Sequence, residues 1–179
     1  MNRVGRQKGG VGIFISNDVK YKLRQDLCIA NSHFESCFVE IENNNMKNSL
    51  IGVIYRAHTA IDNFITDVDP ILQIINNEKK ECYIMGDYNI DLLKEDSDRQ
   101  THDYLDLIYS HSMIPSILKP TRITETSATI IDNILTNSDS EIKTAILVTD
   151  ITDHFPTILM TKCRNAKVTQ DSKNKNTFV

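Results

Sequence analysis

Short apolar runs alternate with polar segments in the first third of the chain, and three of these runs have the character of strands. They are 9–16 (GGVGIFIS), 36–42 (SCFVEIE) and 49–56 (SLIGVIYR). In the second run Cys37, Val39 and Ile41 fall on one face, which is the two-residue period of a strand. The third run is apolar throughout and indicates a more fully buried strand. The pattern therefore predicts a sheet.

The period then changes to that of a helix. Apolar residues recur at helical spacing at Ile61, Phe64, Ile65, Val68, Ile71, Leu72 and Ile75. They predict one helix with a kink at Pro70. A strand at 82–86, a helix near 100–112 and three closing strands at 130–137, 143–149 and 155–160 follow. Many strands with only two inserted helices favour an α+β fold, with sheet packed on sheet and helices outside.

Length and composition fit one domain. The chain has 179 residues, of which 40% are hydrophobic and 25% charged, so it is long enough to bury a core. We place the domain at 1–164 and a flexible tail or linker at 165–179, which has little to bury. The four cysteines form no CxxC pair, and no apolar run approaches the roughly 20 residues of a membrane span. Reduced thiols, no membrane partner and an intracellular location are expected.

Charge restricts the partners that the surface can bind. The formal net charge of -4 argues against a protein whose whole surface grips nucleic acid. Basic residues gather at both ends: Arg3, Arg6 and Lys8 at the start, and Lys162, Arg164, Lys167, Lys173 and Lys175 at the end. Taken alone, such clusters are more often solvated termini than binding sites.

The segment 85–98 (MGDYNIDLLKEDSD) has acids and amides at a spacing that resembles a calcium loop. Counted from Asp87, position 6 of such a loop needs glycine and position 12 a bidentate glutamate, but the chain has Leu92 and Asp98 there. A helix should also precede the loop, whereas an apolar strand-like run does. We therefore interpret the segment as a strand followed by polar residues at its end.

Four polar pairs stand where predicted apolar strands end. They are Tyr55 with Arg56, Asp87 with Asn89, Asp132 with Asn133, and Asp153 with His154. A single aspartate beside a strand is usually a turn or cap residue, and a single histidine is more often structural than catalytic. Ends of rigid strands are also where catalytic groups gather, so the set as a whole is a candidate site.

Together and in this order, VIYR, GDYN, SATIIDNIL and TDHFP resemble the endonuclease/exonuclease/phosphatase family, and most of all the endonuclease domain of non-LTR (LINE-type) retrotransposons. The resemblance runs from about residue 9 to 160. It implies two packed, mainly antiparallel sheets flanked by helices, a four-layer α-β-β-α sandwich. Inositol polyphosphate phosphatases of this family carry a Trp-x-Asp-Arg signature at the third motif, and this chain contains no Trp.

The resemblance also implies roles. Asp87 is similar to the aspartate that orients or activates the attacking water, Asn89 to the amide beside it, and Tyr55 to a phenol that contacts the phosphate. Asp132 is similar to the carboxylate that orients the histidine at His154. The cofactor it implies is Mg²⁺, with Mn²⁺ as an alternative.

Three further residues complete the expected site. Asp153 is similar to an acid at the metal and phosphate site, and Arg56 and Ser127 are expected to contact substrate. The family pattern also has a leading Asn and a principal metal-binding Glu on two strands upstream of residue 9. Neither has a counterpart here, so we expect an N-terminally truncated domain that lacks those two strands.

The leading hypothesis is a Mg²⁺-dependent endonuclease that nicks DNA and leaves a 3′-hydroxyl, with the DNA phosphate backbone as its partner. The resemblance adds a reverse transcriptase domain of the same polyprotein, and a nuclear location if the element is active. Two alternatives stay open: an inactive relic that binds nucleic acid or a partner, and a phosphatase of the same fold.

Overall fold

A six-stranded mixed sheet forms the centre of the computed structural model, which describes residues 10–43 and 47–161. Its strand order is β1-β2-β3-β4-β8-β5. The bounds are β1 Tyr21–Leu23, β2 Phe34–Ile41, β3 Ser49–Arg56, β4 Cys82–Asp87, β8 Asp132–Thr136 and β5 Ile114–Pro115. Within this sheet β3 and β4 run parallel, joined by a helix, and the other neighbours are antiparallel.

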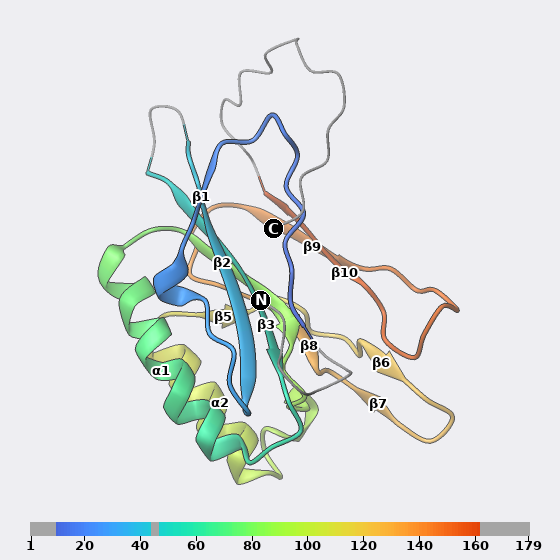
Figure 1. The fold of residues 1–179 in the computed structure, drawn as a ribbon. Coiled ribbons are helices and arrows are strands. Elements are labelled where there is room, and N and C mark those ends of the chain that lie inside the picture. The colour runs from blue at the N-terminus through green and yellow to red at the C-terminus, as the bar shows by residue number, and fades with distance from the viewer. Residues whose placement is uncertain (1–9, 44–46, 162–179) are drawn as a thin grey trace.

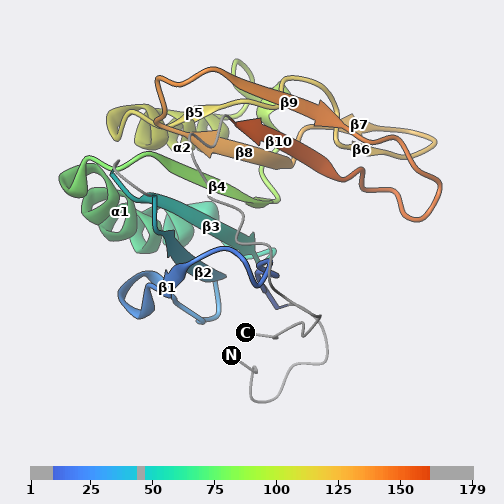
Figure 2. The same cartoon turned by 90° about the horizontal axis from the view of Figure 1, so that it is seen from above.

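Helices α1 (Ile61–Glu78) and α2 (Arg99–Ser110) lie together on one side of this sheet, and the antiparallel pair β9 (Ile142–Ile146) and β10 (Thr157–Thr161) lies on the other (Figures 1 and 2). A short hairpin of β6 (Arg122–Ile123) and β7 (Ala128–Thr129) extends from that second side. Two 3-10 turns, η1 (Gln25–Leu27) and η2 (Leu92–Lys94), complete the described elements. The expected α+β arrangement of packed sheets with helices outside is confirmed.

The main core fills the space between the large sheet and the helices. Phe64 of α1 is fully buried and packs edge-on against Phe34 of β2, with ring centroids 5.5 Å apart. Tyr104 of α2 lies 6.1 Å from Phe64 and 5.9 Å from Tyr88, which follows β4. The helical stripe predicted from the sequence is therefore the face of α1 that packs on the sheet, and Pro70 is accommodated inside α1.

The first predicted strand is the one that the structure does not form. Residues 10–16 belong to none of the described strands, and the sheet begins instead at β1, a three-residue strand that the pattern did not indicate. Val11, Ile13 and Ile15 are half-buried and alternate with exposed residues, so the alternation is present without a ladder. Glycines at 10 and 12 weaken strand pairing, and Gly10 has a φ of 129°. The predicted tail at 165–179 and both basic clusters lie outside the described residues.

The polar loop after β4 is not a calcium hand. It follows a strand, as predicted, and its acids are used as caps. Asp91 accepts hydrogen bonds from the backbone N–H groups of Leu93 and Ile130, and Asp98 caps α2 by accepting from the N–H of Thr101. One oxygen of Asp91 and one of Asp98 thus serve as backbone caps.

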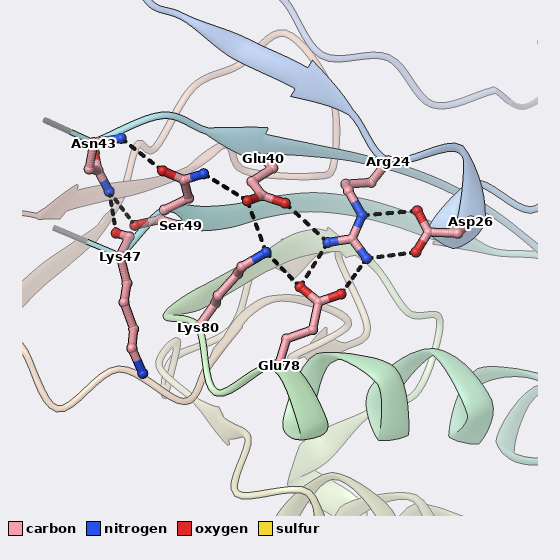
Figure 3. A network of polar contacts seen from close by, with 9 residues as sticks. Arg24, Asp26, Glu40, Asn43, Lys47, Ser49, Glu78 and Lys80 are labelled. Atoms are coloured by element: carbon pink, nitrogen blue, oxygen red, sulfur yellow. Dashed lines mark hydrogen bonds and ion pairs between the residues drawn. The ribbon is translucent and has the colours of Figure 1, made fainter.

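Outside the core, a network of ion pairs ties β1, β2 and the end of α1 together. Figure 3 shows Arg24, Glu40, Glu78 and Lys80 pointing toward one another. Arg24 donates to Glu78 at 2.5 Å and to Asp26 at 2.6 Å, and Lys80 donates to Glu40 at 2.9 Å. The Arg24 guanidinium holds the pKa of Glu78 below its ordinary value. This network closes the end of the sheet opposite the polar strand ends.

Two smaller expectations concern thiols and membranes. Cys28, Cys37 and Cys82 are free thiols, as predicted, and burial raises the pKa of Cys82. Within residues 10–43 and 47–161, neither helix has the length and apolar character that crossing a membrane requires.

Candidate active site

Three neighbouring strands bring polar side chains into one row. Tyr55 of β3 pairs in register with Asp87 of β4, and Asp87 pairs in turn with Asp132 of β8. Residues in register on neighbouring strands point to the same face. Here it is the face away from the helices, because the alternate residues Ile54 and Ile84 belong to the helix-side core.

His154 joins this row from the segment between β9 and β10. Its Nδ1 donates to the carboxylate of Asp132, at 3.0 Å from Oδ2 and 3.2 Å from Oδ1. Ligand atoms of Asp87, Asp132 and His154 all lie within 4.8 Å of one another, and all three residues are partly buried. The sequence prediction that these strand ends converge is therefore confirmed for these three residues, which we call the Asp87 cluster.

Asp87 is the residue of the Asp87 cluster whose pKa is raised. Burial is the main cause that raises the pKa of its carboxyl, and the nearby Asp132 adds to the rise. A hydrogen bond from the N–H of Asn89 to Oδ1, at 2.9 Å, acts in the opposite direction. Two carboxylates this close favour either a shared proton or a bound cation.

The backbone after β4 is held by unusual local geometry. Asn89 has a φ of 49°, a left-handed conformation that Asn tolerates better than most residues. Its side-chain Nδ2 donates to the carbonyl of Arg56 at 2.7 Å. Gly86 allows β3 to approach, since a Cβ there would lie 1.8 Å from the carbonyl oxygen of Ile54. These contacts place Asp87 at a fixed position beside β3.

The structure corrects the expectation that Arg56 contacts substrate. Arg56 is 4% exposed, and its guanidinium donates to the carbonyls of Tyr88, Ala57, Thr59 and Asn89 at 2.6–3.0 Å. Burial lowers its pKa. Strand alternation explains the error, because Tyr55 takes the site-facing position and turns Arg56 toward the helices. Arg56 therefore supports the loop that carries Asn89.

Asp153 also lies differently from the prediction. It is absent from the Asp87 cluster, and its Oδ2 accepts from Nε of Arg122 at 2.7 Å. This partner lowers the pKa of Asp153. A role as metal ligand is therefore not supported by its position. Ser127 lies at the exposed tip of the β6–β7 hairpin, where its hydroxyl contacts that of Thr124 at 2.8 Å.

Sequence reasoning missed two residues that hold the site. Thr121 is fully buried, and its hydroxyl accepts from the N–H of Asp132 at 3.0 Å. Asn133, 2% exposed, accepts from the N–H groups of Ser116 and Ile117 and donates to the carbonyl of Ile117. Asn133 was noted only as half of a polar pair. Its position directly after Asp132 on a strand was a usable signal, since neighbours on a strand face opposite sides.

The sheet with helices on one face, the second antiparallel pair on the other and a carboxylate–histidine cluster at the strand ends defines the endonuclease/exonuclease/phosphatase fold. Among solved structures, the chain is similar to the endonuclease domain of TRAS1, a telomere-specific non-LTR retrotransposon. The TM-score is 0.61 at 12% identity, over 83% of this chain and 69% of that one.

Two other solved structures share the fold. The APE2 catalytic domain of Xenopus laevis gives a TM-score of 0.54 at 18% identity, over 74% of this chain and 56% of that one. An endonuclease/exonuclease/phosphatase protein of Beutenbergia cavernae gives 0.53 at 10% identity, over 83% and 45%. The chain thus spans about half of each of these two proteins. Comparison with protein-family models and with curated proteins finds no match.

Proposed function

We propose that this chain is a divalent-metal-dependent phosphodiesterase that nicks DNA and leaves a 3′-hydroxyl end. The observation that carries the proposal is the Asp87 cluster, in which two carboxylates and an imidazole from three separate segments lie within 4.8 Å. The likeness of the fold to a retrotransposon endonuclease domain supports DNA as the substrate, at a TM-score of 0.61. A reverse transcriptase partner in the same polyprotein and a nuclear site of action belong to the same proposal.

The donor set fits a hard divalent cation. Asp87 and Asp132 offer carboxylate oxygens, the ligands that Mg²⁺ and Mn²⁺ prefer. The raised pKa of Asp87 is a further reason, because a cation between the two carboxylates would relieve their repulsion. When bound, such an ion would neutralise charge on the phosphate oxygens as the phosphodiester is attacked. Asp87 and Asp132 would hold it.

His154 is prepared to bind phosphate. Because Nδ1 donates to Asp132, the ring presents Nε2 to a substrate oxygen. With both ring nitrogens protonated, the imidazole donates from Nε2 to the phosphate anion and stabilises charge in the transition state. Asp132 therefore orients His154.

Asp87 is the group placed to handle the attacking water. Its ionised carboxylate accepts a proton from a water aligned with the scissile bond, and its raised pKa makes it a better base than an exposed aspartate. The Asn89 N–H fixes one carboxylate oxygen at 2.9 Å, and the carboxylate keeps further lone pairs for a water as well as a cation. Tyr55 lies in register beside Asp87, and we assign its phenol the role of contacting a phosphate oxygen.

Nicking of supercoiled plasmid in Mg²⁺ or Mn²⁺ tests the proposal. We expect activity that EDTA abolishes and that Asp87→Ala and His154→Ala each lower by about 10²- to 10⁴-fold. His102→Ala is the matched control, because His102 is an exposed histidine paired with Asp106 on α2. Extension of the nicks by a DNA polymerase reports the 3′-hydroxyl.

Three outcomes would contradict the proposal. DNA binding with no cleavage under any divalent ion would favour a binding role. Release of phosphate from a terminal phosphomonoester, with intact plasmid left uncut, would favour a phosphatase. Cleavage that is equally strong in Asp87→Ala would come from another site or a contaminant.

A further inference from the structure

Arg122 is held opposite the histidine of the Asp87 cluster. The two residues form an antiparallel bridge between β6 and the segment that leads into β10. Backbone bonds on either side fix this pairing: Ile123 N–H donates to the Asp153 carbonyl at 3.1 Å, and Phe155 N–H donates to that of Thr121 at 2.7 Å. Directly opposed residues project their side chains to the same face, with Cβ atoms about 5 Å apart. Arg122 therefore stands directly beside His154, the residue that reaches Asp132.

One edge of the Arg122 guanidinium is occupied and the rest is not. Nε donates to Oδ2 of Asp153 at 2.7 Å, and the two side chains are 40% and 44% exposed. A guanidinium has five N–H donors, so the two terminal nitrogens keep four after Nε is used. Asp153 thus fixes the direction of a cation that solvent and a ligand can still reach.

The surroundings of Arg122 carry negative charge, which this cation offsets. Asp87 and Asp132 add negative charge to the place that a phosphodiester has to approach, and the whole chain carries a net charge of -4. Arg56, the cation expected from the sequence to serve there, is buried among four carbonyls. Arginine suits phosphate because its planar fork binds two oxygens at once.

We propose that Arg122 contacts the DNA phosphate in this site, and that Asp153 acts as its positioning residue and not as a metal ligand. The inference rests on the proposed phosphodiester substrate. It assigns a substrate-binding role to a residue of the β6–β7 hairpin, and it accounts for an acid next to His154 that lies outside the Asp87 cluster.

Duplex binding in EDTA tests Arg122 without any need for cleavage. Fluorescence anisotropy at several salt concentrations should show that Arg122→Gln raises Kd about tenfold at low salt. The slope of log K against log[salt] should become shallower by about 0.9, the value of one phosphate contact. Arg99→Gln is the matched control, because Arg99 also pairs with an aspartate, Asp103, but lies 91% exposed on α2.

Two further variants separate contact from folding. Arg122→Lys keeps the charge, so it should retain the salt slope while losing part of the affinity that the fork provides. Asp153→Asn should weaken binding in the wild-type chain and change it by less than about twofold when Arg122→Gln is already present, because residues that act as a unit are not additive. Thermal unfolding of each variant confirms that it is folded.

The outcomes test this inference and the proposed function separately. A specific loss in Arg122→Gln supports the inference even if no variant nicks DNA, in which case only the proposed catalysis fails. Equal binding by Arg122→Gln and Arg99→Gln, or no duplex binding at low salt, overturns the inference whether or not the chain nicks. An equal effect of Asp153→Asn in both backgrounds overturns the positioning role.

Discussion

Two aspartates near the end of β4 carry the same side chain in different surroundings. Asp87 is partly buried beside Asp132, which raises the pKa of its carboxyl. Asp91 caps η2 and accepts two backbone N–H groups. A carboxylic acid whose pKa is raised by folding stabilises the native state only at pH values low enough to protonate it. At neutral pH the charge on Asp87 therefore destabilises the fold.

We expect Asp87→Asn to raise the melting temperature of the metal-free protein at pH 7 by a few degrees. The amide oxygen can still accept from Asn89, but the buried charge is gone. The gain should shrink as pH falls toward the ordinary range of Asp, where Asp87 itself is neutral. Asp91→Asn serves as the control and should bring no such gain. A lower melting temperature for Asp87→Asn at pH 7 would contradict the assignment of burial as the main cause.

The same shift sets the acid side of the activity profile. Under the proposed function Asp87 must be ionised, so the nicking rate should fall as pH drops through its raised pKa. The fall should begin at a higher pH than for an exposed aspartate. Saturating Mg²⁺ should move it back to lower pH, because the cation favours the ionised form. If the pH at which the nicking rate falls does not change with Mg²⁺ concentration, this would count against binding of the cation at Asp87.

At this scale the sequence located the residues of the Asp87 cluster better than the partners of the other candidate residues. Asp87, Asp132 and His154 were found through their motifs and meet as predicted. Arg56 was misplaced because adjacent strand residues face opposite sides. The partner of Asp153 was not visible, since Arg122 lies 31 residues away in the chain.

At the scale of elements, the parallel pair β3–β4 depends on the absence of a side chain at residue 86. A Cβ at Gly86 would lie 1.8 Å from the Ile54 carbonyl oxygen, so backbone would have to move. We expect Gly86→Ala to lower the free energy of unfolding by about 2–4 kcal/mol and to impair the site. Gly12→Ala, where nothing lies within 4 Å, is the matched control and should change stability by less than about 0.5 kcal/mol. Chemical denaturation measures both.

The network in Figure 3 should contribute more to the free energy of unfolding than a surface ion pair does. The Arg24 side chain is 8% exposed and serves Asp26, Glu40 and Glu78. Arg24→Gln would leave these carboxylates close together without their cation, so we expect a loss of about 2 kcal/mol in the free energy of unfolding. Lys22→Gln on the exposed side of β1 should cost little. If both variants lose the same small amount of unfolding free energy, the network contributes no more than surface ion pairs do.

Element prediction succeeded where a period could repeat. β2 and α1 are long enough for their apolar periods to define them. β5, β6 and β7 have two residues each, too few for any period, and they exist because tertiary contacts place them. The segment 10–16 had the right alternation, but it joins none of the described strands.

For the whole molecule, the proposed DNA binding should depend on net charge and on salt concentration. With a net charge of -4, long-range forces oppose association, and a few local cations must provide the affinity. Three phosphate contacts would give a slope of roughly -2.7 for log K against log[salt]. We therefore expect weak duplex binding at low salt that largely disappears near physiological salt, and that is indifferent to sequence. A salt titration with two unrelated duplexes measures both. Binding that is insensitive to salt would require base contacts instead.

The overall plan was the most predictable level. Many strands and two helices restrict a domain of 179 residues to a few layered arrangements, and the ordered motifs selected one of them. The placement of both described helices on the same sheet was not predictable from the pattern. It depends on which apolar faces meet, and these belong to segments far apart in the chain.

Asn133 also determines how β8 is aligned along β4. If β8 slipped by one residue along β4, Asp132 would turn toward the helices, and an amide would replace the carboxylate opposite Asp87. The bonds from Asn133 to the backbone of Ser116 and Ile117 exist in only one of these alignments. Asn133 thus stabilises one alignment of β8 along β4 over the other. A chain that folds with the wrong alignment loses several buried hydrogen bonds as well as the Asp87 cluster.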